Sequence, residues 1–533
     1  QRRLSGVRGH ESGSLPRRPH RKGSRCGLRE AAGENHKFGI FWIRYHKKPE
    51  WITTKNRNGL PQKTGMNCSF QKRFLHLHIV NEYGMEYKKR MVDTLLADSL
   101  DAFGAVLIEG PKWCGKTTTA DKFAKSKIWL EDPDNREKYE ATAQSTPSML
   151  LKGDTPRLID EWQDIPVLWD AVRTSVDRSD DVGLYILTGS AVVDKSKIKH
   201  SGTGRIEKLK MYPMSLYESG ESNGKISIQE LFDNNNLDID GISSDCTVQE
   251  LIFATCRGGW PGTFKARTDN ARLKTAASYF KAVCDEDVSR IDGVRRNPLI
   301  ARLILKSYAR NISTFAKKSS MIADVAGVTE TLDEKTFNDY VEVFERLFVL
   351  EDIYGWCPSI RSATAMRSGP KREFIDPSVA IAALGLSPES FQMDLKTFGF
   401  FFENLCIRDL RAYTQPHDAH LSYYHDRYGL EADAVLHLAD GRYALIECKL
   451  GSREIEEGAN HLSELKRLIT EHNRTEKQCP LREPDLLIVL TGGQMAYTRK
   501  DGVKVDDRRS KPGLRSRSPT YRPRPCSLGT GCS

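Results

Sequence analysis

The chain has 533 residues, 39% of them hydrophobic, and its 81 Lys and Arg against 71 Asp and Glu give a formal net charge of +10. The charge is uneven, because residues 1–84 carry +13 and residues 508–533 carry +7, which leaves −10 for the body between them. The body is therefore mildly acidic, so the overall charge gives no argument for nucleic-acid binding, and any contact with DNA would need a local patch.

The 12 cysteines include no C-x-x-C pair, and Cys114, Cys406 and Cys448 lie in apolar or motif stretches. This usage favours a reducing cytoplasm over a disulfide framework or a structural zinc site. No apolar run approaches the roughly 18 residues of a membrane span, so no membrane partner is expected. The basic N-terminal stretch lacks the apolar segment of a secretory signal. A cytoplasmic location is the prediction.

Residues 1–84 are rich in Arg, Gly, Ser and His, and their composition predicts a basic disordered extension. Residues 508–533 form a second Arg/Ser/Pro-rich tail, for which we also predict disorder. Either tail could be a basic arm for nucleic acid or an extension with no function of its own. Helical periodicity begins just after Met85, which favours the second interpretation for the N-terminal tail.

Residues 104–120 read GAVLIEGPKWCGKTTTA and contain the pattern G-x-x-x-x-G-K-[ST]. The apolar run before Gly110 predicts a buried strand, and residues Thr118 to Lys127 predict a helix. Gly110 and Gly115 would let the backbone turn so that its N–H groups face phosphates. The context of strand, loop and helix favours a nucleotide site over an ordinary glycine turn.

In such a loop the side chains have distinct roles toward ATP and Mg²⁺. Lys116 would neutralise the β- and γ-phosphates, and the hydroxyl of Thr117 would reach Mg²⁺. Thr118 would continue the phosphate-facing turn into the helix. ATP and Mg²⁺ are therefore the expected cofactors.

Residues 85–215 alternate helical and strand patterns, which predicts a parallel sheet flanked by helices. Residues 157–161 read RLIDE, a short strand that ends in two acids. Asp160 would hold the Mg²⁺ shell, and Glu161 would activate the attacking water. The alternative is a pair of solvated turn residues.

The next strand, residues 184–190, ends at Ser190, where a γ-phosphate sensor would lie. A simple Ser/Gly turn explains the same residues nearly as well. Arg205 follows in the flexible sequence GTGR and could act as an arginine finger, in cis or from a neighbouring subunit. An ordinary surface arginine is an equally good interpretation.

Residues 216–296 predict a helical region. Residues 297–357 carry three helical patterns, Leu299 to Arg310, Ser320 to Val325 and Lys335 to Leu347, followed by an apolar stretch. This order suits a winged helix. The face of the third helix is not strongly basic, so a packing module between domains is at least as good an interpretation as a DNA reader.

Residues 358–507 hold a second set of charged residues. Asp433 and Glu447 lie on two strand patterns that form a predicted hairpin, and Lys449 shares a strand face with Glu447. Two carboxylates across a hairpin suit a second Mg²⁺ site. The alternative is a half-exposed strand with a Glu–Lys pair. Glu403 lies on a preceding amphipathic helix pattern.

The stretches GPKWCGKTT, LIDEWQ, LTGS, GTGR, RGGWP, IDPSVA and EADAVL with IECKLG resemble prokaryotic AAA-type ATP-binding proteins with a C-terminal domain of unknown function. The resemblance covers roughly residues 85–500. It implies an α/β chain with a P-loop AAA-type ATPase core, a winged helix and a C-terminal domain similar to the PD-(D/E)xK nuclease fold. It also implies Asp433, Glu447 and Lys449 as a nuclease-like set, with Glu403 as an accessory acid.

The sequence is therefore compatible with three functions. The first is an ATPase that uses Mg²⁺ to rearrange its C-terminal half, with Lys116, Glu161 and Arg205 as catalytic residues. The second is a nucleotide-gated module that binds DNA or protein with little turnover, and the third is an ATP-regulated, Mg²⁺-dependent nuclease. Self-association is a further expectation, since Arg205 could act in trans.

Overall fold

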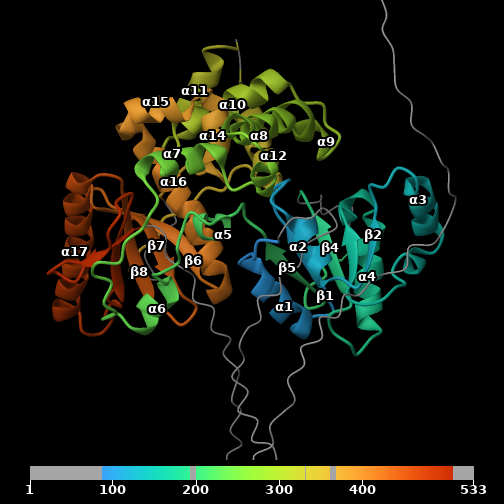
Figure 1. The fold of residues 1–533 in the computed structure, drawn as a ribbon, viewed down its shortest axis with the longest axis horizontal. Helices are drawn as coiled ribbons and strands as arrows, with labels where there is room; N and C mark the ends of the chain where they lie inside the picture. Colours follow the sequence, from blue (N-terminus) through green and yellow to red (C-terminus); the bar gives the residue numbers. More distant parts are fainter. Residues whose placement is uncertain (1–86, 192–199, 330–331, 360–367, 508–533) are drawn as a thin grey trace, which may run out of the picture. The chain divides into compact units, whose positions relative to one another are not determined.

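The computed structural model describes residues 87–191, 200–329, 332–359 and 368–507 (Figure 1). The predictions of disorder for residues 1–84 and 508–533 lie outside these residues. No described helix is long and apolar enough to cross a membrane.

A five-stranded parallel sheet forms the first part of the described chain, in the order β2-β3-β4-β1-β5. This confirms the prediction of an α/β region with a parallel sheet. Strand β1, which lies between β4 and β5, is apolar on both faces, as expected for a strand covered by helices on each side. The strands of this sheet are β1 (Ala105–Glu109), β2 (Ser126–Trp129), β3 (Arg157–Asp160), β4 (Tyr185–Gly189) and β5 (Ile206–Lys210). The helices of this part are α1 (Val92–Ala102), α2 (Lys116–Phe123), α3 (Arg136–Ser145) and α4 (Val167–Asp177).

The helix after the glycine loop is shorter than the sequence pattern predicted. It ends at Phe123, and Lys127 lies in β2 rather than in the helix. The N–H of Lys125 donates to the carbonyl of Pro156 at 2.8 Å, which draws the chain into the sheet beside β3. Pairing with a strand distant in sequence therefore overrides the local helical preference.

A helical part follows, in which α14 packs against both α8 and α10. The three helices predicted for residues 297–357 are present as α10, α11 and α12. The apolar stretch after them forms two isolated antiparallel bridges, Leu350 with Phe374 and Ile353 with Lys371. The winged-helix interpretation stays a prediction. The bounds are α5 (Leu216–Ser219), α6 (Ile228–Asp233), α7 (Val248–Arg257), α8 (Asp269–Ala282), α9 (Val288–Arg290), α10 (Pro298–Arg310), α11 (Lys318–Ala326), α12 (Glu334–Arg346), α14 (Pro377–Leu384) and α15 (Pro388–Met393).

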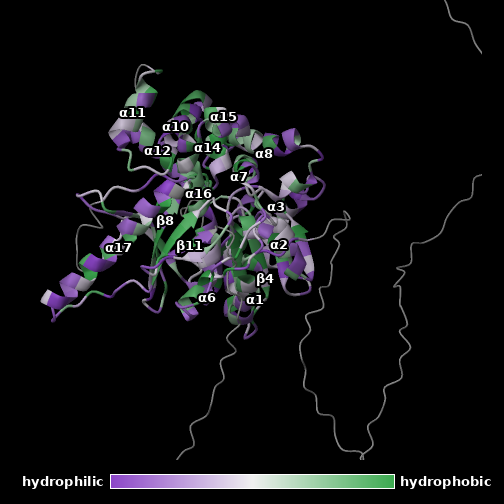
Figure 2. Ribbon diagram, turned by 60° about the vertical axis from the view of Figure 1, so that its left-hand side comes forward, coloured by the Kyte–Doolittle hydropathy of each residue, from purple (hydrophilic) through white to green (hydrophobic). Residues whose placement is uncertain are grey.

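The last part is a six-stranded mixed sheet in the order β10-β11-β9-β8-β7-β6. The predicted hairpin is present, with the turn at Gly441 and an antiparallel β7–β8 pair. Helices α16 and α17 pack against β8, and Figure 2 shows polar and apolar residues alternating along α17. The bounds are α16 (Leu395–Thr414), β6 (His420–His425), β7 (Glu431–His437), β8 (Tyr443–Lys449), α17 (Ser452–Thr475), β9 (Leu486–Thr491), β10 (Tyr497–Thr498) and β11 (Lys504–Asp507).

Candidate functional site

The glycine loop leaves the carboxyl end of β1 and enters the N-terminus of α2. Gly115 adopts φ +105°, a conformation that residues with a Cβ rarely adopt. At Gly110 a Cβ would collide with the carbonyl oxygen of Met211, so the close approach to the chain after β5 requires glycine. The two predicted glycines therefore shape the turn that leads into the helix, whose first N–H groups have no partner within the helix.

Lys116 is buried and folds back over its own loop. Its Nζ donates to the carbonyl of Gly110 at 3.0 Å and to that of Pro111 at 2.9 Å. Thr117 and Thr118 line the same cavity as Lys116. The lysine charge is thus already held at the mouth of the loop, where a phosphate group would replace the two carbonyl partners.

Asp160 lies at the carboxyl end of β3 and contacts the glycine loop. The hydroxyl of Thr117 donates to Asp160 Oδ1 at 2.8 Å, and the hydroxyl of Thr188 donates to the same oxygen at 2.6 Å. Because β4 lies between β3 and β1, the ends of all three parallel strands meet at one edge of the sheet. Burial raises the pKa of Asp160, so its ionised form would gain from a nearby cation.

Glu161, the next residue, has a left-handed backbone with φ +51°. Its N–H donates to Thr188 Oγ1 at 3.1 Å, which fixes this turn to the end of β4. Its Oε2 accepts hydrogen bonds from Gln163 and, at 2.9 Å, from Ser190. Ser190 therefore orients the carboxylate of Glu161, and Gln163 is a positioning residue that the sequence did not single out.

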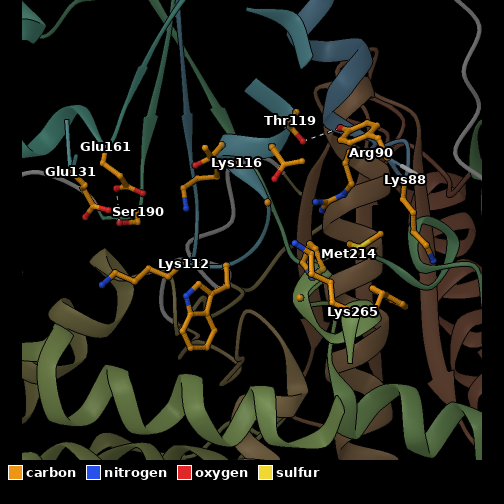
Figure 3. Close-up of a pocket in the computed structure, with 18 of the residues that line it drawn as sticks. Lys88, Arg90, Lys112, Lys116, Thr119, Glu131, Glu161, Ser190, Met214 and Lys265 are labelled. Carbon is orange, nitrogen blue, oxygen red and sulfur yellow. Dashed lines mark hydrogen bonds between the residues drawn. The ribbon is translucent and has the colours of Figure 1, made fainter. Parts of the chain in front are cut away.

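A cavity of about 830 Å³, within the usual size of small-molecule sites, is lined by Lys116, Thr117, Thr118, Glu161 and Ser190. Figure 3 shows Glu131, Glu161 and Ser190 on one side of Lys116, with Met214 and Lys265 on the other. The lining also includes the aromatic and apolar side chains of Tyr87, Pro261 and Phe264 and the cationic side chains of Lys88, Arg90 and Lys265. The cavity thus offers both positive charge and apolar surface to a ligand.

The end of the RGGWP stretch and the residues after it form part of the cavity wall. The sequence alone did not indicate this position. Pro261 and Phe264 line the cavity, and the Gly259 carbonyl accepts a 2.7 Å hydrogen bond from the Met214 N–H. A Cβ at Gly259 would collide with the Met214 backbone, so only glycine allows this approach. The helical part thus closes the cavity opposite the glycine loop.

The sequence analysis also missed six charged lining residues, which are Lys88, Arg90, Lys112, Glu131, Lys265 and Arg290. Lys112 Nζ donates to Asp287 at 2.5 Å, and Arg290 of α9 lies 3.8 Å from Glu131. Burial and the neighbouring Glu161 raise the pKa of Glu131. No local motif marks Lys112, Glu131 and Arg290, because they meet only when α9 packs over the loops of the parallel sheet.

Arg205 does not enter the cavity. It lies directly before β5, whose first residue Ile206 pairs with Ala105 at the start of β1, whereas the glycine loop follows the opposite end of β1. Its Nε lies 2.7 Å from Asp177 Oδ1. The arginine-finger interpretation in cis is therefore wrong for this arrangement, and a role in trans stays a prediction.

The predicted C-terminal residues do come together. The register that places Ala434 opposite Ile446 brings Asp433 opposite Glu447, and Lys449 Nζ lies 2.6 Å from Glu447 Oε2. Lys371, which the sequence analysis missed, joins the group from the segment between α12 and α14. Its Nζ donates to Asp433 Oδ1 at 2.9 Å and also contacts Glu403.

Lys371 changes the electrostatics of this group. Burial alone would raise the pKa of Asp433, but the ammonium groups of Lys371 and Lys449 hold it below its usual value. Burial, together with Asp433, raises the pKa of Glu403 and that of Glu447. Both carboxylates of the predicted Mg²⁺ site, Asp433 and Glu447, therefore already contact ammonium groups, and Lys371 also contacts the accessory acid Glu403.

Three parts of the chain match described protein families. Residues 102–220 match an AAA domain, residues 248–390 match a domain of unknown function (DUF8612), and residues 398–506 match another (DUF4143). The first match supports an AAA-type ATP-binding domain around the glycine loop. The other two carry no described activity.

The chain is also similar to the uncharacterized proteins Mb2031c of Mycobacterium bovis and Rv2008c of Mycobacterium tuberculosis. Each is 23% identical over 364 residues, which is 67% of this chain and 73% of the relative. Among solved structures, the Walker-type ATPase PABY2304 of Pyrococcus abyssi is 13% identical with a TM-score of 0.35, over 57% of this chain and 97% of that chain. A DNA-bound Drosophila ORC structure is 13% identical with a TM-score of 0.16, over 53% and 89%.

Proposed function

We propose that this protein hydrolyses ATP in the cavity beside the glycine loop and uses the reaction to move its C-terminal half. The observation that carries the proposal is the hydrogen bond from Thr117 to Asp160, next to the buried amino group of Lys116. It joins a phosphate-binding loop to an acid at a neighbouring strand end, as a nucleotide site requires. The AAA-domain match over the same residues supports it.

The donor set suits Mg²⁺ with a bound triphosphate. Thr117 supplies a hydroxyl oxygen and Asp160 a carboxylate oxygen, and Mg²⁺ prefers one or two such protein ligands together with phosphates and water. When bound, the ion would neutralise charge on the β- and γ-phosphates. Lys116 would exchange its two carbonyl partners for phosphate oxygens. Glu161, oriented by Ser190, would accept a proton from the attacking water.

Buried contacts join the cavity wall to the C-terminal half. The N–H of Gly259 donates to Asp376 Oδ2 at 2.9 Å, and Arg408 of α16 donates to the same oxygen at 3.0 Å. Asp409 of α16 accepts a 3.1 Å hydrogen bond from the N–H of Leu216, two residues after Met214. A shift of the cavity wall would therefore be transmitted to α16, the helix that also carries Glu403.

Changing Glu161 to glutamine is expected to leave ATP binding intact and slow turnover by about 10²- to 10⁴-fold, the usual contribution of a general base. The amide keeps the size of the side chain but cannot accept the proton. Steady-state turnover and binding of a labelled ATP analogue would be measured on one preparation. Glu137→Gln, on the surface helix α3, is the matched control. Unchanged turnover in Glu161→Gln would reject the assignment of the base.

Arg290 and Arg205 should differ in their effect on hydrolysis. Arg290→Ala removes a positive charge from the cavity, and we expect at least a tenfold loss of kcat, below the larger effects known for arginine fingers. Arg205→Ala should stay within about twofold where the chains are monomeric, because electrostatic stabilisation of the reaction needs contact with the phosphates. Turnover would be measured across protein concentration. A loss in Arg205→Ala that grows with concentration would instead support a role in trans and self-association.

Nuclease activity is less well supported than ATP hydrolysis. Asp433 contacts Lys371 and Glu447 contacts Lys449, so both predicted Mg²⁺ ligands already have a cationic partner. No feature of the described residues supports DNA binding. DNA binding would be tested by measuring DNA affinity across salt concentration, with and without ATP, because phosphate contacts make that affinity fall steeply as salt rises.

A further inference from the structure

A second group of metal-ligating side chains lies beside the buried lysines, and it involves residues outside the predicted set. Glu431 of β7, Glu447 of β8 and His461 of α17 each offer one donor atom, and these atoms all lie within 4.8 Å of one another. The three residues come from two paired strands and from the helix that packs on them. Their proximity is therefore a product of the tertiary fold.

The two oxygens of Glu447 have different partners. Oε2 lies 2.6 Å from Lys449 Nζ, whereas Oε1 lies 3.3 Å from His461 Nδ1. Two ligand atoms of a tetrahedral Zn²⁺, each about 2.0–2.1 Å from the metal, are separated by about 3.3 Å. The Glu447–His461 separation thus matches two corners of such a site.

The surrounding group holds more carboxyl groups than ammonium groups. Glu403, Asp433 and Glu447 are buried, and the ammonium groups that contact them are Lys371 and Lys449. Glu431 adds a further, partly exposed carboxylate. Asp433 cannot readily serve as the ligand, because its oxygens already accept from Lys371 and from the N–H of Cys448 at 2.9 Å each. The donor atoms that face away from the lysines are therefore those on the His461 side of Glu447.

We propose that Glu431, Glu447 and His461 bind a divalent transition-metal ion of the Zn²⁺ type, with water completing the coordination. This site shares Glu447 with the all-oxygen Mg²⁺ site predicted at Asp433 and Glu447. The imidazole nitrogen distinguishes the two sites, since Mg²⁺ and Ca²⁺ prefer oxygen ligands. The ion would link α17 to the β7–β8 hairpin. The inference does not depend on ATP hydrolysis, because its residues lie outside the nucleotide cavity.

The test is Zn²⁺ titration of the full chain without nucleotide, followed by calorimetry and thermal melting. Cys479, an exposed thiol, is changed to serine in every variant to remove one competing ligand. The expected result is binding that weakens at least tenfold in His461→Ala and in Glu431→Gln, and a Zn²⁺-dependent rise in Tm lost in both. His472→Ala, at an exposed position of the same helix, should bind as the parent does.

Several outcomes would overturn the site. They are no Zn²⁺ binding by the parent, equal binding by all variants, or an equal loss in His472→Ala. If His461→Ala fails to fold, Glu431→Gln decides the question, because it keeps the size of a partly exposed side chain. Mg²⁺ that binds as tightly as Zn²⁺ under the same conditions would reject the assignment of the metal class.

Discussion

Replacing Lys116 with alanine is expected to abolish measurable ATP hydrolysis and to weaken nucleotide binding. Lys116 is the first residue of α2, and two backbone carbonyls hold its buried amino group at the loop. Removing a preorganised charge from the place where phosphate charge develops typically costs about 10²–10³-fold in kcat. The loss of ground-state phosphate contacts adds to that effect.

Turnover and nucleotide binding would be measured for Lys116→Ala beside Lys122→Ala. Lys122 lies later on the same helix, partly exposed, and is not in the cavity wall. We expect the control to behave as the parent does. Hydrolysis by Lys116→Ala at the parental rate would reject the nucleotide site, whereas equal loss in both variants would indicate a damaged α2.

Replacing Arg408 with alanine is expected to cause the largest loss of stability among single changes in α16. The guanidinium is 1% exposed and contacts Asp376 at 3.0 Å and Asp409 at 2.7 Å, and both carboxylates are buried. Removing one partner of a buried ion pair typically costs about 3–5 kcal/mol, because it leaves an uncompensated charge in the core. Here two carboxylates would be left, along with a cavity.

Urea unfolding followed by tryptophan fluorescence would measure this loss. Arg467→Ala on α17 is the matched control, since Arg467 also pairs with two carboxylates but is exposed to solvent. We expect no measurable shift in its unfolding midpoint. An Arg408→Ala midpoint equal to that of Arg467→Ala would show that the buried network does not stabilise the junction between the cavity wall and α16.

The sequence by itself determined the features that depend on neighbouring residues. The apolar run before Gly110 predicted β1, and the spacing of Gly115, Lys116 and Thr117 predicted the loop that follows. The acids after residues 157–159 were correctly expected beside that loop, because the carboxyl ends of parallel strands share one edge. The hairpin of Asp433 and Glu447 followed from strand alternation and a glycine turn.

Only the tertiary structure decided what faces these motifs. Arg205 lies beside the start of β1, whereas the glycine loop follows the end of β1. The positive charge of Arg205 therefore gave no information about its distance from that loop. Lys371 reaches Asp433 across 62 residues, and His461 meets Glu447 from a helix packed on the sheet. Periodicity and spacing report a residue's own strand or helix, whereas these contacts depend on how separate elements pack, and that packing is set by burial over the whole chain.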